Sequence, residues 1–230
     1  MNTKVSVLEF KNKEYLSNAL SSKVSDLLSK KISISDEAWL VVPGGNTPMD
    51  LFDSLSLKNI EWNRVNITLT DERWVKTDSL MSNERLVRNS LLKNKACSAN
   101  FFGLKTSHNS ISEGLNTIKK RLKSFQVPEV LVLGMGLDGH TASMFPNDPN
   151  LTLYLSLSNT EIFSRVKLKT NDIERITLNY NYLSSAKNII LLIHGVDKMR
   201  ALNKAMKENN PMKYPISAFF DKNFEVYWSR

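Results

Sequence analysis

The sequence predicts an α/β protein, a three-layer α/β/α domain with a mostly parallel sheet. Helix-like patterns alternate with short apolar runs along the chain, which is typical of parallel sheets with helices on both faces. The apolar runs are continuous rather than alternating, as expected of strands that are covered on both faces. No internal repeat and no linker rich in Pro, Gly or Ser divides the 230 residues, so we expect one domain over residues 1–230.

The first half of the chain alternates helices and strands. Apolar residues recur at helical spacing over residues 15–28, which predicts an amphipathic helix. Residues 38–42 form an apolar run that ends in a Pro-Gly-Gly sequence and predicts a buried strand. Thr47 followed by Pro48 predicts a helix start, with threonine as the cap and proline at the first helical position. The remaining elements of this half are a strand over residues 65–70 and a helix over residues 82–92.

The second half begins with the clearest helix pattern, over residues 110–125. Two continuous apolar runs, 130–133 and 188–194, predict further buried strands. The apolar residues of the helix are separated by four, three, four and three positions: Ile111, Leu115, Ile118, Leu122 and Phe125. Weaker patterns predict short strands around Val166 and Ile176, a helix that carries Met199, Leu202 and Met206, and a strand over residues 226–228.

Composition excludes several protein classes. Hydrophobic residues make up 41% of the chain and charged residues 23%, which is unlike collagen-like or disordered sequences. The apolar runs are far shorter than the ~20 residues of a membrane-spanning helix, and residues 1–15 lack the apolar core of a secretory signal. We therefore expect a cytoplasmic protein with no membrane partner. Cys97 is the single cysteine, which excludes an internal disulfide and a cysteine-based zinc cluster.

The formal net charge of +8 indicates an anionic partner, either a nucleic acid or a small molecule. The basic residues are scattered, and the sequence has no basic tail, no aromatic stacking cluster and no recognition-helix signature. We therefore expect no nucleic-acid partner and favour a small anion. Ligands of parallel α/β sheets bind at the carboxyl ends of strands, so the loops after four predicted strands are candidate sites.

The first of these loops, residues 43–48, joins a strand directly to a helix. Gly44 and Gly45 let the backbone approach a ligand closely, and the helix N-terminus behind them suits a phosphate or an oxyanion. The Lys-Ser/Thr pair of a Walker loop is absent from this segment. An ordinary glycine turn capped by Thr47 is an equally valid interpretation.

In the second loop, Arg73 follows two acidic residues at the end of a strand. Arginine is the side chain best shaped to bind a phosphate through two hydrogen bonds. The alternative is a structural salt bridge between Arg73 and Asp71 or Glu72. Asn83, at the start of the next predicted helix, would serve either as a polar contact or only in the helix cap.

The third loop, residues 134–146, gives the strongest sequence indication of a functional site. Its glycines fit a dinucleotide-binding pattern, but prolines interrupt the helix that should follow. His140 lies in a glycine-rich turn two residues after Asp138, so a general base oriented by a carboxylate is the favoured interpretation. A structural histidine bonded to the backbone is the alternative, and two such residues are too few for a metal site.

Two further cations lie near predicted strand ends. Lys198 follows the strand over 188–194, and Arg175 begins a short strand. Either side chain would bind an anion, although most lysines are simply surface residues. His108 and His194 lack neighbours that would mark them as catalytic. The residues alone thus predict an enzyme with a phosphorylated small substrate and a histidine acid/base step, and leave the reaction open.

Six blocks of the sequence are PGGNTP at 43–48, TDERWV at 70–75, SNERLVRNSLL at 82–92, LGMGLDGHTASMFP at 133–146, ERITL at 174–178 and IHGVDK at 193–198. The order and spacing of these blocks resemble the 6-phosphogluconolactonases over nearly the whole chain. The resemblance implies the three-layer fold shared with glucosamine-6-phosphate deaminases and ribose-5-phosphate isomerases. Three features depart from the family pattern: Asn46 replaces a common Ser, Met144 replaces a common Leu, and the chain stops soon after its last Trp.

The same resemblance implies hydrolysis of 6-phospho-D-glucono-1,5-lactone to 6-phosphogluconate in the oxidative pentose phosphate pathway. His140 would take a proton from the attacking water and return it to the ring oxygen, and Asp138 would orient His140. Backbone N–H groups of the loop at residues 43–48 or of the Gly136 turn would stabilise the oxyanion. The implied substrate-binding residues are Gly44, Gly45, Asn46, Thr47, Arg73, Asn83, Gly136, Arg175 and Lys198.

The resemblance implies no metal and no organic cofactor. The expected partner is a phosphorylated sugar lactone. We expect the chain to be a monomer or a weak homo-oligomer. The nearest alternative is a glucosamine-6-phosphate deaminase. That family carries DEY rather than the DER of residues 71–73 and continues differently after the histidine, so the sequence favours the lactonase.

Overall fold

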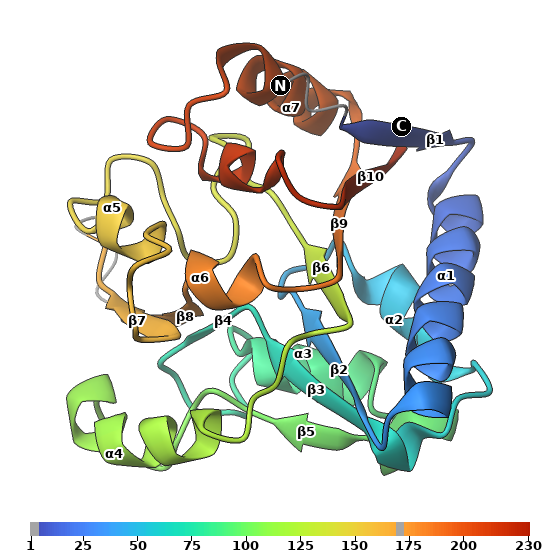
Figure 1. Cartoon of the computed structure of the whole chain (residues 1–230), viewed down its shortest axis with the longest axis horizontal. Coiled ribbons are helices and arrows are strands. Elements are labelled where there is room, and N and C mark those ends of the chain that lie inside the picture. The colour runs from blue at the N-terminus through green and yellow to red at the C-terminus, as the bar shows by residue number, and fades with distance from the viewer. Residues whose placement is uncertain (1–4, 169–172) are drawn as a thin grey trace.

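A computed structural model describes residues 5–168 and 173–230. Its main element is a seven-stranded sheet in the order β1-β10-β9-β6-β2-β3-β5, in which every neighbouring pair is parallel. The strands are β1 (Ser6–Phe10), β2 (Ala38–Val42), β3 (Val65–Leu69), β5 (Asn100–Phe102), β6 (Val130–Leu133), β9 (Asn188–His194) and β10 (Phe224–Ser229). Figure 1 shows α1 and α2 on one side of this sheet and α6 on the other.

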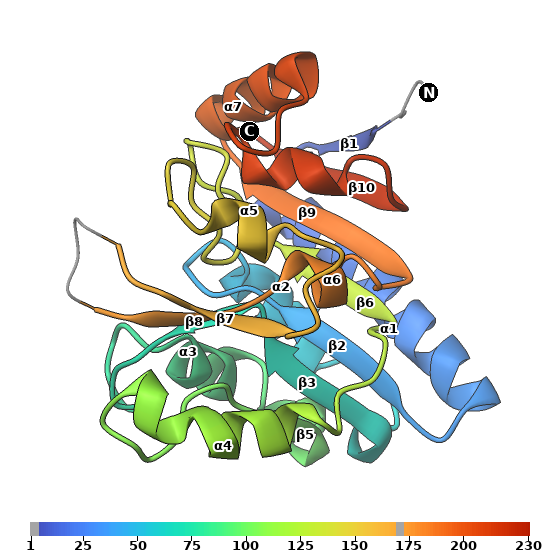
Figure 2. The same cartoon turned by 60° about the vertical axis from the view of Figure 1, so that its left-hand side comes forward.

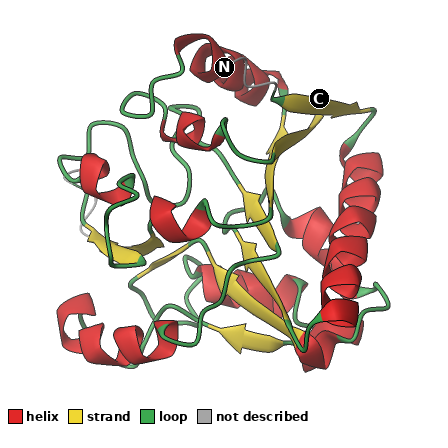
Figure 3. Ribbon diagram, in the orientation of Figure 1, coloured by secondary structure: helices red, strands yellow, loops and turns green. Residues whose placement is uncertain are grey.

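Helices alternate with the strands of the main sheet along most of the chain, as predicted. Figure 3 shows the helices in red and the strands in yellow. All five residues of β2 are buried, and so are all four of β6, because helices cover both faces of the central strands. The α-helices are α1 (Lys13–Ile34), α2 (Met49–Ser56), α3 (Asn83–Ser90), α4 (Ile111–Leu122), α5 (Leu151–Tyr154), α6 (Tyr180–Leu183) and α7 (Val196–Glu208). Short 3₁₀ helices cover Trp62–Arg64, Asn94–Ser98 and Pro215–Phe219. No helix in the described part of the chain is long and apolar enough to cross a membrane.

A second, antiparallel sheet has the order β4-β8-β7. It consists of β4 (Asp71–Arg73), β8 (Arg175–Leu178) and β7 (Phe163–Val166), and Figure 2 shows β7 and β8 side by side. The prediction of a loop directly after residue 70 is therefore wrong. The chain passes from β3 into β4, and β4 pairs with β8 in a register that places Arg73 opposite Arg175.

The structure confirms most predicted elements and corrects two further details. Pro48 is the N-cap of α2 and makes no side-chain cap bond, so the predicted threonine cap is wrong. Met49 N–H donates to the Asn46 carbonyl at 3.3 Å, and this turn leaves Pro48 one position outside the helix. Leu115, placed in the apolar stripe of α4, is 38% exposed. It lies beyond the face of α4 that is packed on the core.

Candidate functional site

A cleft of about 210 Å³ lies at the carboxyl edge of the main sheet. The loops after β2, β6 and β9 meet there because parallel strands end at the same edge, and β4, α3 and β8 complete the wall. Asn46 is exposed and does not line the cleft, and Asp138 lies behind His140 rather than in the wall. The predicted site residues that line it are Gly44, Gly45, Thr47, Arg73, Asn83, Gly136, His140, Arg175 and Lys198.

The turn after β6 holds His140 against Asp138. His140 Nδ1 lies 2.6 Å from Asp138 Oδ1, and the backbone N–H of His140 donates to the same oxygen at 3.2 Å. With Nδ1–H donated to the carboxylate, Nε2 is the nitrogen left to accept a proton. A Cβ at Gly136 would lie 2.1 Å from His140 Nδ1, so only glycine fits beneath this pair. Gly139, at φ +79°, completes the turn.

The Asp138–His140 contact shifts the titration of the carboxyl group. Burial raises the pKa of Asp138, but the hydrogen bond and charge of His140 oppose burial, and the net pKa lies below its usual value. Ionised Asp138 therefore favours the folded state above pH ~4, and this contribution is lost as the pH falls through the lowered pKa.

We expect Asp138→Asn to lower kcat for the reaction at this cleft by about 10- to 100-fold, because the neutral amide no longer stabilises a protonated His140. The expected KM change is small. Steady-state rates measure both, and urea unfolding between pH 3 and 6 should show a weaker pH dependence in the variant. Asp26→Asn, on the exposed face of α1, is the control; a wild-type kcat in Asp138→Asn contradicts the orienting role.

Two arginines face each other across β4 and β8. Arg73 donates through a terminal nitrogen to Asn83 Oδ1 at 2.6 Å, while Arg175 lies over the ring of Phe145 at 5.3 Å from its centroid. Among the described residues, the buried Nε atoms of Arg73 and Arg175 have no hydrogen-bond partner. Burial lowers the pKa of Arg175; nearby Asp71 raises it and Arg73 lowers it by smaller amounts. Like charges opposite each other in a sheet are unfavourable, so this arrangement suits a bound anion.

Lys198 approaches the cleft from the start of α7. Its ammonium donates to the Met135 carbonyl at 2.6 Å, which ties the first turn of α7 to the loop after β6. Burial lowers the pKa of Lys198, and the nearby Asp138 charge opposes that shift. A cation, a histidine and two guanidinium groups therefore border one cleft.

The loop after β2 closes on α3. A Cβ at Gly44 would lie 1.9 Å from Asn83 Oδ1, so glycine is required for this close approach. Gly45 has φ +81°, a conformation that favours glycine, and is exposed at the mouth of the cleft. The two glycines and the arginine pair therefore line the same cleft.

Comparison with known proteins agrees with this geometry. The sequence profile of the family described as Glucosamine-6-phosphate isomerases/6-phosphogluconolactonase matches residues 11–228. This chain belongs to that family. The 6-phosphogluconolactonase of Pseudomonas aeruginosa is 35% identical over 210 residues, which cover 91% of this chain and 88% of that protein. That of Mesorhizobium japonicum is 37% identical over 224 residues, covering 96% and 93%.

Solved structures of the family share the fold. A crystal structure of a 6-phosphogluconolactonase from Shewanella baltica superposes with a TM-score of 0.94 at 35% identity, covering 99% of this chain and 98% of that one. A monomeric glucosamine-6-phosphate deaminase superposes with a TM-score of 0.80 at 18% identity, covering 98% of each chain, which shows a common fold. The predicted likeness to the sugar-phosphate deaminase fold is confirmed.

Asp71 was not among the site residues predicted from the sequence. Asp71 lines the cleft, and its carboxylate accepts from Ser143 Oγ at 2.6 Å and from Thr70 Oγ1 at 2.9 Å. Within the described residues, no ion pair joins Arg73 to Asp71 or Glu72, so the salt-bridge alternative is wrong. The position of Asp71 beside Arg73 at a strand end was the available signal.

Glu72 holds the first turn of α3 in place. Its carboxylate is fully buried and accepts from the backbone N–H groups of Arg73, Asn83 and Glu84 at 2.7–2.8 Å and from Ser82 Oγ at 2.9 Å. Burial raises the pKa of Glu72, and these four bonds oppose the rise. The carboxylate therefore fixes the turn that carries Asn83 to Arg73.

We expect Glu72→Gln to lower the free energy of unfolding by about 2–4 kcal/mol, because the amide NH₂ replaces an acceptor oxygen and faces buried N–H donors. Urea denaturation at pH 7 measures the change. Glu113→Gln, at an exposed position of α4, should alter stability by less than about 0.5 kcal/mol. Equal stabilities of the two variants contradict the capping role of Glu72.

Proposed function

We propose that this chain hydrolyses 6-phospho-D-glucono-1,5-lactone to 6-phosphogluconate, with His140 as the acid/base residue. The observation that carries the proposal is the meeting of the His140–Asp138 pair with Arg73 and Arg175 at one cleft. The family membership and the 6-phosphogluconolactonase relatives support the same substrate. We infer that residues 1–230 act as one catalytic domain, because the cleft draws on segments from residue 43 to residue 198.

In the first step, His140 Nε2 takes a proton from water while the water oxygen bonds to C1 of the lactone. The carbonyl π pair moves onto the carbonyl oxygen and forms a tetrahedral oxyanion. The oxyanion then collapses, the bond from C1 to the ring oxygen breaks, and protonated His140 gives its proton to that ring oxygen. The products are the open-chain acid and free His140.

Backbone N–H groups of the Gly44–Gly45 loop are the better candidates for the oxyanion site. The alternative, the Gly136 turn, has its Gly136 N–H already donated to the His140 carbonyl at 2.9 Å. An N–H group that is engaged in this way is not free for the developing charge. Gly44 and Gly45 lie in the wall of the same cleft as His140.

The 6-phosphate is held by Arg73, Arg175 and Lys198 in this proposal. Asn83 keeps the Arg73 guanidinium in place through the 2.6 Å hydrogen bond. Thr47 lines the cleft and offers a hydroxyl, whereas Asn46 is exposed and outside the wall. We therefore assign Asn46 only a contact at the rim with bound substrate.

The test is hydrolysis of the lactone generated in situ, with acid release followed above the spontaneous background. We expect a rate well above background at micromolar substrate, and no ammonia release from glucosamine 6-phosphate. A rate equal to background rejects the lactonase. Ammonia release without lactone hydrolysis would assign the deaminase reaction to the same cleft.

A further inference from the structure

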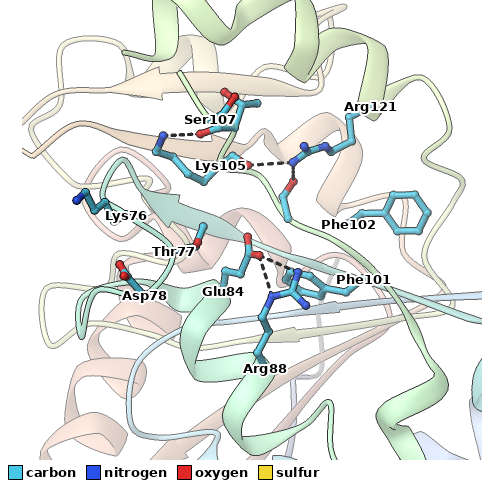
Figure 4. Close-up of a pocket in the computed structure, with 12 residues that line it drawn as sticks. Lys76, Thr77, Asp78, Glu84, Arg88, Phe101, Phe102, Lys105, Ser107 and Arg121 are labelled. Atoms are coloured by element: carbon cyan, nitrogen blue, oxygen red, sulfur yellow. Dashed lines mark hydrogen bonds and ion pairs between the residues drawn. The ribbon is translucent and has the colours of Figure 1, made fainter. Parts of the chain in front are cut away.

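A second cleft, of about 790 Å³, lies beside the first. Helix α3 contributes to both: Asn83 lines the first cleft, whereas Glu84 and Arg88 line the second. The other walls are residues 76–78, the segment from β5 to residue 107, and Arg121 of α4 (Figure 4). No described residue lines both clefts, and none of the predicted site residues lies in the second.

The second cleft carries an excess of positive charge. Four cationic side chains and two carboxylates line it. Arg88 is paired with Glu84, since its Nε and one terminal nitrogen each lie 2.9 Å from Glu84 Oε1. Asp78 is the other carboxylate. The remaining cations are Lys76, Lys105 and Arg121.

These three cations have no carboxylate within ion-pair distance in the described part of the chain. Lys105 donates to the carbonyls of Thr106 and His108, the latter at 2.7 Å. Arg121 donates to the carbonyls of Gly103 and Lys105. A carbonyl is neutral, so these bonds orient the cations without cancelling their charge.

The Lys105 ammonium is also partly removed from water. It lies over the Trp74 ring at 4.2 Å from the centroid, and burial lowers its pKa. An anion bound next to a desolvated ammonium stabilises the charged form. Lys105 therefore gains from an anionic neighbour that the described chain does not provide.

The side chains at the floor of the cleft are closely packed. A Cβ at Gly103 would lie 2.2 Å from Glu84 Oε2, so the backbone just after β5 packs directly against Glu84. The Arg88 guanidinium lies over Phe101 at 4.9 Å from the ring centroid. A site whose side chains are already fixed binds its ligand with less loss of conformational entropy.

We propose that this second cleft binds a dianionic phosphate monoester of metabolite size, with Lys76, Lys105 and Arg121 as its cationic contacts. The excess of two positive charges in the lining matches the dianion, and the volume lies in the usual range for metabolite sites. The apolar edge of Phe101 offers a surface for the organic part of the ester. This inference does not depend on the reaction at the first cleft.

The experiment measures the binding of inorganic phosphate by isothermal titration calorimetry at low salt. We expect two classes of site in the wild-type protein. In the double variant Lys76→Gln/Lys105→Gln, the affinity of the second cleft for phosphate should fall at least tenfold. Glutamine is chosen at position 105 because its amide can still donate a hydrogen bond to a carbonyl. Arg175→Gln should weaken only the other class. Lys204→Gln, exposed on α7, is the control and should bind as the wild type.

Two outcomes overturn the proposal. One is a single class of site that is lost in Arg175→Gln and unchanged in Lys76→Gln/Lys105→Gln. The other is equal weakening in Lys204→Gln and the double variant, which reports general charge only. Lactone hydrolysis by the double variant should remain at the wild-type rate, so failure of this site and failure of the lactonase are separate results. Circular dichroism confirms that the double variant is folded.

Discussion

His140→Asn is expected to lower kcat/KM for lactone hydrolysis by about 10²- to 10⁴-fold, the usual contribution of a positioned acid/base residue. Asparagine cannot accept a proton from water at neutral pH, and it cannot return one to the ring oxygen. The side chain of His140 is 32% exposed, so its replacement should cost little stability. Acid release from lactone generated in situ, corrected for spontaneous opening, measures the loss.

The matched control is His108→Asn. His108 lies outside the first cleft, where its Nδ1 contacts Thr106 Oγ1 at 2.9 Å, and its replacement should leave kcat/KM within twofold of the wild type. Inorganic phosphate binding by His140→Asn should be unchanged, which separates loss of chemistry from loss of the cleft. Hydrolysis by His140→Asn at more than a tenth of the wild-type rate would falsify the acid/base role.

Arg175→Gln is expected to raise KM about 10- to 100-fold with a small change in kcat, because a charge-assisted hydrogen bond to a phosphate is worth about 1.5–3 kcal/mol. The same change removes a like charge opposite Arg73 and a partly buried cation. We therefore expect the unliganded variant to melt at or above the wild-type temperature. Initial rates over a range of lactone concentrations and thermal melts test the two statements.

Phosphate should affect the two proteins differently. A ligand that binds only the folded state stabilises it by RT ln(1 + [L]/Kd), so inorganic phosphate should raise the melting temperature of the wild type more than that of Arg175→Gln. Arg200→Gln, in an exposed ion pair with Asp197, is the control and should behave as the wild type. A drop in kcat at unchanged KM in Arg175→Gln contradicts a phosphate-binding role.

The central strands of the fold could be predicted to the residue. The runs at 38–42, 130–133 and 188–194 are continuous and apolar because helices cover both faces of β2, β6 and β9. The edge strands β1 and β5 were missed. The residues of β1 are mostly exposed and those of β5 number three, so neither carries a pattern that separates it from a loop.

Local parts of the site could also be predicted. His140 and Asp138 are two residues apart in a glycine turn, so their contact follows from local geometry. The contact of Asp71 with Ser143 spans 72 positions in the chain, and the pairing of Arg73 with Arg175 depends on strand register. Neither is encoded in local spacing, and the uncompensated charge of Lys105 is visible only once its neighbours are placed.

The position of β1 in the sheet has a consequence for biosynthesis. β1 pairs with β10, with Ser6 opposite Glu225, so β1 is made long before its partner strand. At about 5–20 residues per second, ribosomal synthesis leaves β1 without its partner strand for roughly 10–40 s. The nascent chain must therefore hold an unpaired strand edge until β10 has been made, and β1 can join the sheet only after that point.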